Sequence, residues 1–273
     1  PIQEFFEWMR DDEAKLSVSD ASCTLDEPSA VEMDVGTIRA RFADASAHEE
    51  PWNLLEVGKP HMRSFRPTMF DEFKYSFLKY LGDFAIMGSH GARMRASASQ
   101  ILKFPGLQEW VLIAEAGAIT LPHQDSHGYS TWLKVLQGEV GFGWLASQDE
   151  NHVEAWSKDR FWKGPKNNPQ WRYIVLRPGE WVRFPSGTTH FVFRRSADDA
   201  QTMMIGGHYL EWSGVEKWMR VIINQLNHPD ATNESLVEDI VSHVKAGCKL
   251  IKKEAMKGNW DLLGGKDAVT RFW

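Results

Sequence analysis

The stretch from Arg177 to Arg194 reads RPGEWVRFPSGTTHFVFR, and it contains two short apolar runs joined by a tight turn. Both runs, Trp181–Phe184 and His190–Arg194, are rich in β-branched and aromatic residues. The Pro185-Ser186-Gly187 segment between them has the composition of a turn. The sequence therefore predicts two strands, with His190 opening the second.

Runs of the same character lie on both sides of this pair. They are Trp110–Ala114, Ala118–Leu121, Thr131–Leu136, Tyr173–Leu176 and Thr202–Ile205. Turn residues such as Gly138 bound them. Many short strands at this spacing predict a β-sandwich or barrel, because parallel βαβ units would need helices between the strands. The polar segment 147–170 is expected to be a long insertion between strands.

Helices are expected on both sides of this β region. We predict a helical extension over residues 1–104 that packs on the barrel, with a loop at 17–30 and a helix from Met69 to Gly82. The β core spans 105–210. Residues 211–273 form amphipathic C-terminal helices, which either pack on the barrel or form a homodimer interface.

The composition is that of an ordinary globular chain, with 273 residues, 42% hydrophobic and 25% charged. No apolar run reaches the 18 residues or so that a bilayer span requires, so membrane spanning is unsupported. The net charge of −6 argues against a nucleic-acid partner. Cys23 and Cys248 lie far apart without a Cys/His cluster, which excludes a zinc finger and favours a reducing, intracellular compartment.

A metal site is predicted from the histidines. Two His and one carboxylate form a metal site when a His-x-acid pair on a strand meets a distant His. The chain has four such pairs, His48/Glu50, His123/Asp125, His152/Glu154 and His228/Asp230. Only His123 ends a predicted strand, and His190 opens another, so His123, Asp125 and His190 are the predicted metal ligands. The alternative is that these are ordinary polar residues at a barrel rim.

Four segments together resemble a known family. They are Thr120-Leu-Pro-His123-Gln-Asp125, Trp132-Leu-Lys-Val-Leu-Gln-Gly138-Glu139, the Arg177–His190 stretch and Gly206-Gly-His208-Tyr-Leu210. In order and spacing they are similar to the JmjC family of Fe(II)- and 2-oxoglutarate-dependent oxygenases. The likeness is greatest to the lysine-demethylase subgroup with a Gly-Gly-Asn-Phe-Leu segment. It covers roughly residues 105–225.

The resemblance implies a double-stranded β-helix barrel, of the jelly-roll or cupin-like kind, with Fe(II) on His123, Asp125 and His190. It implies 2-oxoglutarate as co-substrate, with the Thr120 hydroxyl on a co-substrate carboxylate. Such enzymes convert 2-oxoglutarate to succinate while hydroxylating a C–H bond, and hydroxylation of an N-methyl group releases formaldehyde. The implied partner is a protein or peptide, such as a histone lysine, in the nucleus or cytoplasm.

One departure concerns the co-substrate. The family usually has a lysine two or three residues after the glycine that corresponds to Gly138, and Val140 stands there. Burying a carboxylate beside valine without a cation would cost several kcal/mol. Lys134 is the first candidate substitute, and Arg183, Arg194 and Arg195 follow. The valine also leaves open a catalytically silent JmjC scaffold, and a cupin-like metalloenzyme that uses no 2-oxoglutarate is a third possibility.

Further residues have two interpretations each. His208 replaces the subgroup's asparagine and either contacts the co-substrate or packs in the core. His127, two residues after Asp125, could replace a metal ligand, or it lies near the substrate or behind the ligands. A tryptophan group could form a cage for a methylated cation or simply fill the core. Its members are Trp132, Trp144, Trp156, Trp162 and Trp171.

Overall fold

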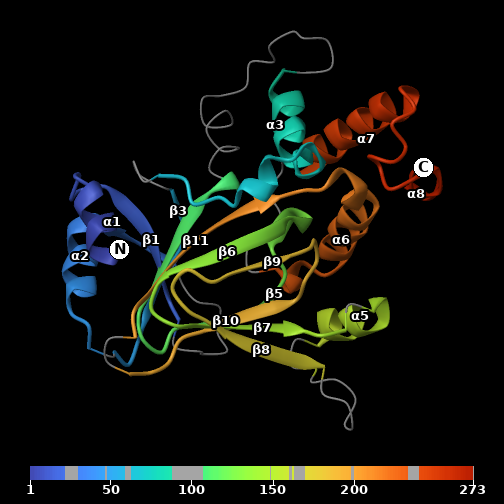
Figure 1. The fold of residues 1–273 in the computed structure, drawn as a ribbon. Coiled ribbons are helices and arrows are strands. Elements are labelled where there is room, and N and C mark those ends of the chain that lie inside the picture. Colours follow the sequence, from blue (N-terminus) through green and yellow to red (C-terminus); the bar gives the residue numbers. More distant parts are fainter. Residues whose placement is uncertain are drawn as a thin grey trace.

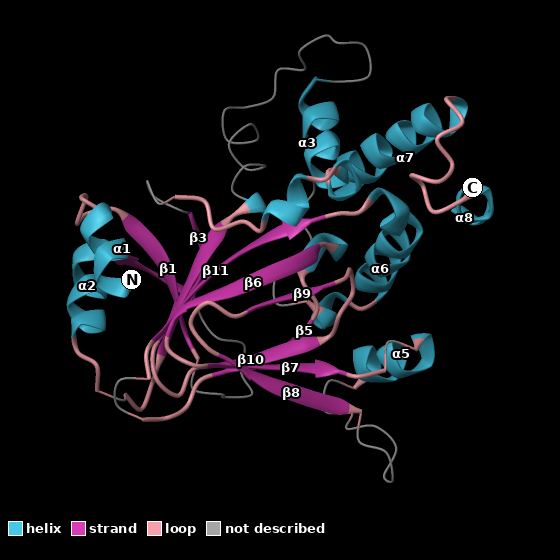
Figure 2. Ribbon diagram, in the orientation of Figure 1, coloured by secondary structure: helices cyan, strands magenta, loops and turns pink. Residues whose placement is uncertain are grey.

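The computed structural model describes residues 1–21, 30–46, 48–58, 63–87, 107–147, 149–159, 162, 170–197, 200–232 and 240–272. Two β-sheets face each other, with helices at the ends and edges (Figures 1 and 2). The larger sheet has seven strands in the order β2-β1-β3-β4-β11-β6-β9, and the smaller has four in the order β5-β10-β7-β8. The strands are β1 (Lys15–Asp20), β2 (Ala30–Asp34), β3 (Trp52–Gly58), β4 (Trp110–Ala114), β5 (Ile119–His123), β6 (Ser130–Gln137), β7 (Val140–Leu145), β8 (Trp171–Leu176), β9 (Trp181–Phe184), β10 (His190–Phe193) and β11 (Thr202–Tyr209).

The strand order is that of a jelly roll. From β4 to β11 the chain passes back and forth between the sheets, with only β7 and β8 consecutive in the same sheet. As a result β10 lies between β5 and β7, although about seventy residues separate β5 from β10 in the chain. All pairs within these sheets are antiparallel. The predicted mainly-β barrel with helical parts is confirmed.

The central strands of the large sheet are buried on both faces. On β4, Val111 and Ile113 pack outward against the N-terminal helices, whereas Trp110 and Leu112 face the interior between the sheets. The side chains of β11 alternate between the same two sides. This double burial explains their nearly continuous apolar sequence.

The prediction of a purely helical and irregular N-terminal region was wrong. Helices α1 (Ile2–Trp8) and α2 (Val35–Ala43) are present, but β1, β2 and β3 extend the large sheet through the pairing of β3 with β4. The segment expected as a loop begins as β1, where Val18 is buried and Ser17 is exposed. A strand near the edge of a sheet has polar residues on its outward face, so its composition is similar to that of a loop. Such a strand is recognised only from the strand with which it pairs.

Strand β7 was missed because of its glycines. Gly141 and Gly143 look like turn residues, yet each leaves space for a ring of β10. A Cβ on Gly141 would lie 2.1 Å from the Phe193 ring, and one on Gly143 would lie 2.0 Å from the Phe191 ring. The glycines therefore let two aromatic side chains cover the outer face of β7.

The predicted helix from Met69 to Gly82 is broken. Two short 3-10 turns, Thr68–Asp71 and Phe73–Tyr75, precede α3 (Phe77–Met87), which continues through Gly82. The chain bends at Ser76 because Ser76 bridges to Leu210 at the end of β11 and the Phe77 amide donates to the Leu210 carbonyl.

The remaining helices lie near one end of the sheets (Figure 2). They are α5 (Glu150–Lys158), inside the predicted insertion, α6 (Val215–Asn227), α7 (Ile240–Met256) and α8 (Lys266–Phe272). The apolar faces of α6 and α7 pack with α3 in one cluster that includes Phe77, Trp218 and Ile251. Among the described residues, no helix is both long and apolar enough to cross a bilayer.

Candidate metal centre

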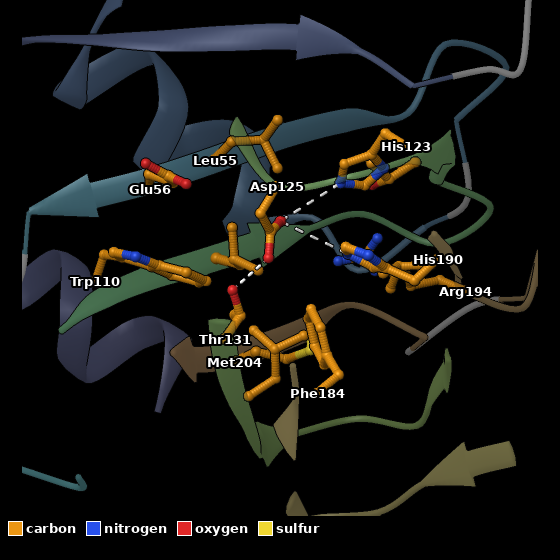
Figure 3. Close-up of a pocket in the computed structure, with 14 residues that line it drawn as sticks. Leu55, Glu56, Trp110, His123, Asp125, Thr131, Phe184, His190, Arg194 and Met204 are labelled. Atoms are coloured by element: carbon orange, nitrogen blue, oxygen red, sulfur yellow. Dashed lines mark hydrogen bonds and ion pairs between the residues drawn. The ribbon is translucent and has the colours of Figure 1, made fainter. Parts of the chain in front are cut away.

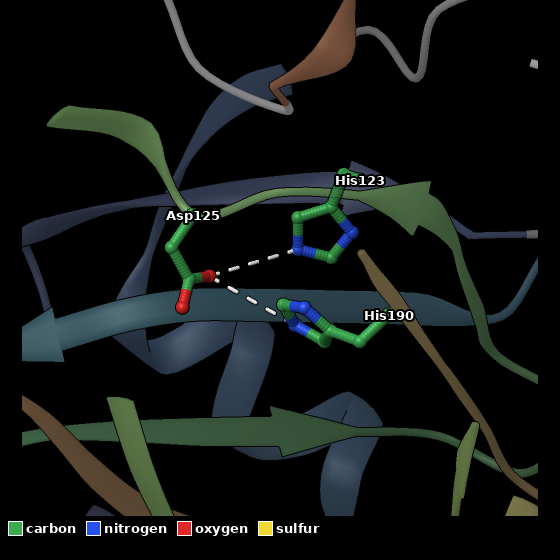
Figure 4. Close-up of side chains that lie close together, drawn as sticks. All are labelled: His123, Asp125 and His190. Atoms are coloured by element: carbon green, nitrogen blue, oxygen red, sulfur yellow. Dashed lines mark ion pairs between the residues drawn. The ribbon is translucent and has the colours of Figure 1, made fainter. Parts of the chain in front are cut away.

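The three predicted metal ligands lie together at the open end of the small sheet. His123 ends β5, His190 opens β10, and the two residues are direct cross-strand partners. Asp125 follows β5 by two residues. One ligand atom from each of the three lies within 4.8 Å of the others (Figure 4). The Nε2 atoms of His123 and His190 lie 3.9 and 3.8 Å from the Asp125 Oδ1 atom.

Hydrogen bonds orient both imidazole rings for metal binding. The Nδ1 atom of His123 lies 2.7 Å from the Leu121 carbonyl oxygen, and that of His190 lies 3.0 Å from the Thr188 carbonyl oxygen. A carbonyl accepts only, so each Nδ1 donates its proton, and in the neutral ring the lone pair is left on Nε2. Both Nε2 atoms face Asp125.

Burial keeps His190 in the form that a metal needs. The ring is 3% exposed, and burial lowers the pKa of His190 to about 4, against a smaller opposing effect of its hydrogen bond to Thr188. A neutral imidazole is the ligand form of histidine. Two such nitrogens and a carboxylate oxygen, with bonds of about 2.1 Å, can surround one ion. The donor set therefore fits a divalent metal.

A polar chain behind Asp125 fixes its carboxylate. The Thr131 hydroxyl donates to the Asp125 Oδ2 atom, and its oxygen lies 2.9 Å from the Nδ1 atom of His208. Since the hydroxyl proton is used on Asp125, His208 must donate at Nδ1. Its Nε2 atom lies 3.4 Å from a carboxylate oxygen of Glu56. Burial raises the pKa of Glu56, but the hydrogen bond and charge of His208, with weaker effects of His127 and His123, bring it below the ordinary value.

Helix α6 holds the main chain of the same loop. The buried Gln225 side chain donates to the Asp125 carbonyl oxygen at 2.8 Å and accepts from the Gly128 amide at 3.1 Å. The Trp218 indole donates to the His127 carbonyl at 2.9 Å. The C-terminal region therefore contributes to the geometry of the site as well as to the core.

A cavity of about 40 Å³ opens beside the metal ligands, between the two sheets (Figure 3). Its polar lining residues are Glu56, Thr120, His123, Asp125, Thr131, His190 and Arg194. The rest of the wall is apolar and includes Leu112, Leu133 and Val192. Such a wall excludes water and strengthens electrostatic interactions inside.

Two of the three predicted co-substrate residues do not line this cavity. Thr120 does, and its Oγ1 accepts a hydrogen bond from the Asn53 amide at 3.2 Å. Lys134 does not, because Thr131 and Leu133 of β6 face the cavity and side chains alternate along a strand. The Lys134 ammonium instead lies 5.9 Å from the Phe65 ring centroid on the opposite face. His208 is buried behind the cavity, in contact with Thr131.

The three arginines that could replace the family's lysine have different positions. Arg183 is 44% exposed and pairs with Glu211, and Arg195 is 71% exposed and pairs with Glu139. Arg194 lines the cavity and is 4% exposed. Val140 is itself buried in the apolar cluster between the sheets.

The other candidate residues lie away from the cavity. His127 has a left-handed backbone, stacks on Tyr129 and belongs neither to the metal group nor to the cavity wall. The five tryptophans do not form one group, because Trp132 and Trp144 belong to two different clusters and Trp156, Trp162 and Trp171 to a third. Cys248 is a free thiol, and Cys23 lies outside the described residues.

Sequence reasoning missed Glu56, Thr131 and Gln225. Glu56 reaches the cavity through an irregularity in β3, where the pairing with β4 shifts between Leu54 and Val57 and Glu56 takes a positive φ of 49°. Nothing in the local sequence marks that bulge. Thr131 begins a predicted strand. The alternation of side chains along that strand could have predicted that Thr131 points toward Asp125, once Asp125 was chosen as a ligand.

Comparison with known proteins agrees with this geometry. No protein-family model matches the chain. A Caenorhabditis elegans JmjC domain-containing histone demethylation protein 1 is 30% identical over 132 residues, which cover 45% of this chain and 12% of that protein. The Mycosarcoma maydis protein of the same name is 29% identical over 140 residues, covering 49% of this chain and 20% of its own length.

Solved structures with some likeness are cupins. The Drosophila melanogaster CENP-C cupin domain has a TM-score of 0.27 at 15% identity, over 42% of this chain and 64% of that one. A cupin superfamily protein from Desulfitobacterium hafniense has a TM-score of 0.24 at 12% identity, over 38% of this chain and 69% of that one.

A jelly roll with two histidines and an aspartate grouped at one end is a cupin-like barrel whose donor set could hold a metal ion. The sequence likeness to the two histone demethylation proteins narrows the class further. Sequence likeness over about half of the chain supports a JmjC-domain family.

Proposed function

We propose that this chain is an Fe(II)- and 2-oxoglutarate-dependent oxygenase that hydroxylates or demethylates a protein side chain. The observation that carries the proposal is the triad of His123, Asp125 and His190, with both imidazole lone pairs turned to the carboxylate. Two His and one carboxylate occupy one side of an ion and leave positions open for other ligands, as non-haem iron oxygenases require.

The residues of the cavity have separate roles in this proposal. His123, Asp125 and His190 hold Fe(II), which together with 2-oxoglutarate and oxygen supplies the oxidation of a C–H bond. Thr131 fixes the Asp125 carboxylate through its hydroxyl. The Thr120 hydroxyl binds a carboxylate of the co-substrate, and the apolar wall keeps bulk water from the reacting atoms.

The substrate class is supported by the relatives. Two proteins that share about half of this chain are named for histone demethylation, and this chain covers a fifth or less of their length. A methylated lysine in a nuclear protein is therefore the substrate that we propose to test first. A polar or acidic protein side chain is the next candidate, since simple hydroxylation needs the same site.

A catalytically silent scaffold is the alternative. It is favoured by one observation, the buried Val140 in place of the family's lysine. The scaffold would keep the fold and the metal but form no succinate.

Succinate formation separates the two. Anaerobically iron-loaded protein is mixed with 2-oxoglutarate, oxygen and methylated histone peptides, and succinate and formaldehyde are measured. We expect succinate from the wild type and none from His190→Ala. His152→Ala is the control, because His152 lies on α5 in another His-x-acid pair and outside the metal group. Folded, iron-bound wild type that forms no succinate with or without peptide would favour the scaffold.

A further inference from the structure

We propose that Arg194 is the cation that binds the distal carboxylate of 2-oxoglutarate. It takes the role of the lysine that the family has at the position of Val140, but it does so from the neighbouring strand. This inference rests on the proposed function. Of the four cations considered from the sequence, it assigns the one that lines the cavity, and Arg194 lies on a different strand from the family's lysine.

The strand register places Arg194 beside Val140. β10 pairs with β7 through Val192↔Phe142 and Phe193↔Gly141, and the next step of this antiparallel register sets Arg194 opposite Val140. Val140 and Phe142 face the interior between the sheets. The Arg194 side chain therefore approaches the cavity from the strand next to β7, at the same height along the sheet as a side chain at position 140.

Alternation along β10 aims Arg194 at the metal cavity. His190, Val192 and Arg194 lie on the same face, and all three line the cavity (Figure 3). The four steps from His190 to Arg194 span about 13 Å of extended strand. A five-carbon diacid is shorter than this span.

Arg194 is buried with part of its hydrogen-bonding capacity unused. Its Nε donates to the Thr202 hydroxyl at 3.1 Å, while Nη1 is buried and has no hydrogen-bond partner among the described residues. No carboxylate of the described residues forms an ion pair with it. Burial lowers the pKa of Arg194 to about 10, which still leaves it charged at neutral pH. A buried, unpaired guanidinium is costly unless a ligand completes it.

Thr120 supplies a second group for the same carboxylate. It pairs with Val192, next to Arg194 on the cavity face, and it lines the cavity. Asn53 donates to its oxygen, so the hydroxyl proton is available to an acceptor. A guanidinium and a hydroxyl donor together form a carboxylate site.

The remaining cations do not compete for this role. Among the described residues that line the cavity, Arg194 is the only lysine or arginine. Lys134 faces the other side of β6, and Arg183 and Arg195 pair with surface glutamates.

Binding measured without turnover tests the assignment. The protein is loaded with Mn(II), and the dissociation constants of 2-oxoglutarate and of 2-oxopentanoate, which has a methyl group in place of the distal carboxylate, are measured by calorimetry. We expect the wild type to prefer 2-oxoglutarate. Arg194→Met should raise the dissociation constant of 2-oxoglutarate by roughly 30- to 100-fold and abolish the preference over 2-oxopentanoate. The Mn(II) affinity and the melting temperature of the metal-free protein should be retained.

Three further variants complete the design. Arg195→Met is the matched control, an adjacent exposed arginine, and should bind both acids as the wild type does. Arg194→Lys should keep most of the preference because it keeps a charge. Arg194→Met combined with Val140→Lys should restore it, because the lysine approaches the same carboxylate from the opposite strand.

The outcomes separate this inference from the proposed function. If Arg194→Met binds 2-oxoglutarate within threefold of the wild type, the assignment is overturned and the oxygenase proposal stands. If Mn(II)-loaded wild type binds no 2-oxoglutarate, both are overturned.

Discussion

At the scale of single residues, the site depends on hydrogen bonds that leave each ligand in one state. Thr131 has no place in the motif, yet its hydroxyl holds Asp125 and accepts from His208. Partners of this kind typically change metal affinity 10- to 100-fold when they are removed. We expect Thr131→Val to weaken Fe(II) or Mn(II) binding by about this factor, measured by metal titration. Thr131→Ser keeps the hydroxyl and is the control, and equal affinity in the valine variant would contradict the role.

The pH dependence of the metal-free protein follows from His190. Its pKa in the folded chain is about 4, below the 6.5 of an unfolded chain, because it is buried. Between these values the unfolded chain binds the proton and the folded chain does not, so stability falls as the pH drops from 6.5 toward 4. Between pH 7 and 4.5 the loss amounts to about 2 kcal/mol. Urea unfolding at pH 7 and 4.5 measures it, and His190→Gln should show a smaller decrease.

At the scale of elements, strand β11 shows why two adjacent glycines are needed. A Cβ on Gly207 would lie 1.9 Å from the main-chain carbonyl oxygen of Gln108, and one on Gly206 would lie 2.5 Å from the Trp110 ring. The Gly-Gly segment, which is part of the resemblance to the JmjC family, is thus a steric requirement of the neighbouring chain at Gln108 and Trp110.

Substitution at this contact has a clear expected result. Gly207→Ala should lower the free energy of unfolding by more than about 2 kcal/mol, because main-chain atoms must move. Gly58→Ala at the end of β3 has open space around its Cβ and should change stability by about 0.5 kcal/mol or less. Chemical denaturation of both variants makes the comparison, and similar losses would show that the contact tolerates a side chain.

At the scale of the whole molecule, the N-terminal region is part of the barrel. The carboxylate of Glu115, just after β4, is fully buried, and Arg41 of α2 binds both of its oxygens at 2.8 Å. The Trp52 amide donates to the same group at 2.7 Å. Because β3 also provides Leu55 and Glu56 to the cavity wall, this ion pair ties the site to the first sixty residues.

Removing the arginine should therefore be costly. Arg41→Met removes the cation that binds both oxygens of a buried carboxylate and leaves it the Trp52 amide and His48. We expect a loss of stability of up to about 3 kcal/mol, with partial recovery on adding Glu115→Gln. Arg177→Met breaks an exposed pair with Glu139 and should change stability by about 1 kcal/mol or less. Thermal and urea unfolding measure both variants. A loss for Arg41→Met no larger than that for Arg177→Met would show that the N-terminal region is only loosely attached.

The sequence by itself predicted the core strands and the three residues that the structure brings together as a candidate metal site, because alternation, turn residues and the end of a strand are local features that constrain where side chains point. It missed β1, β2, β3 and β7, whose polar or glycine-rich residues are explained only by the strands and rings that they contact. The tertiary structure alone decided that Lys134 faces away from the cavity, that Arg194 and Glu56 line it, and that Gln225 binds the main chain at Asp125. The physical reason is that strand pairing between distant segments sets which side chains meet, and pairing partners are not encoded in any one segment.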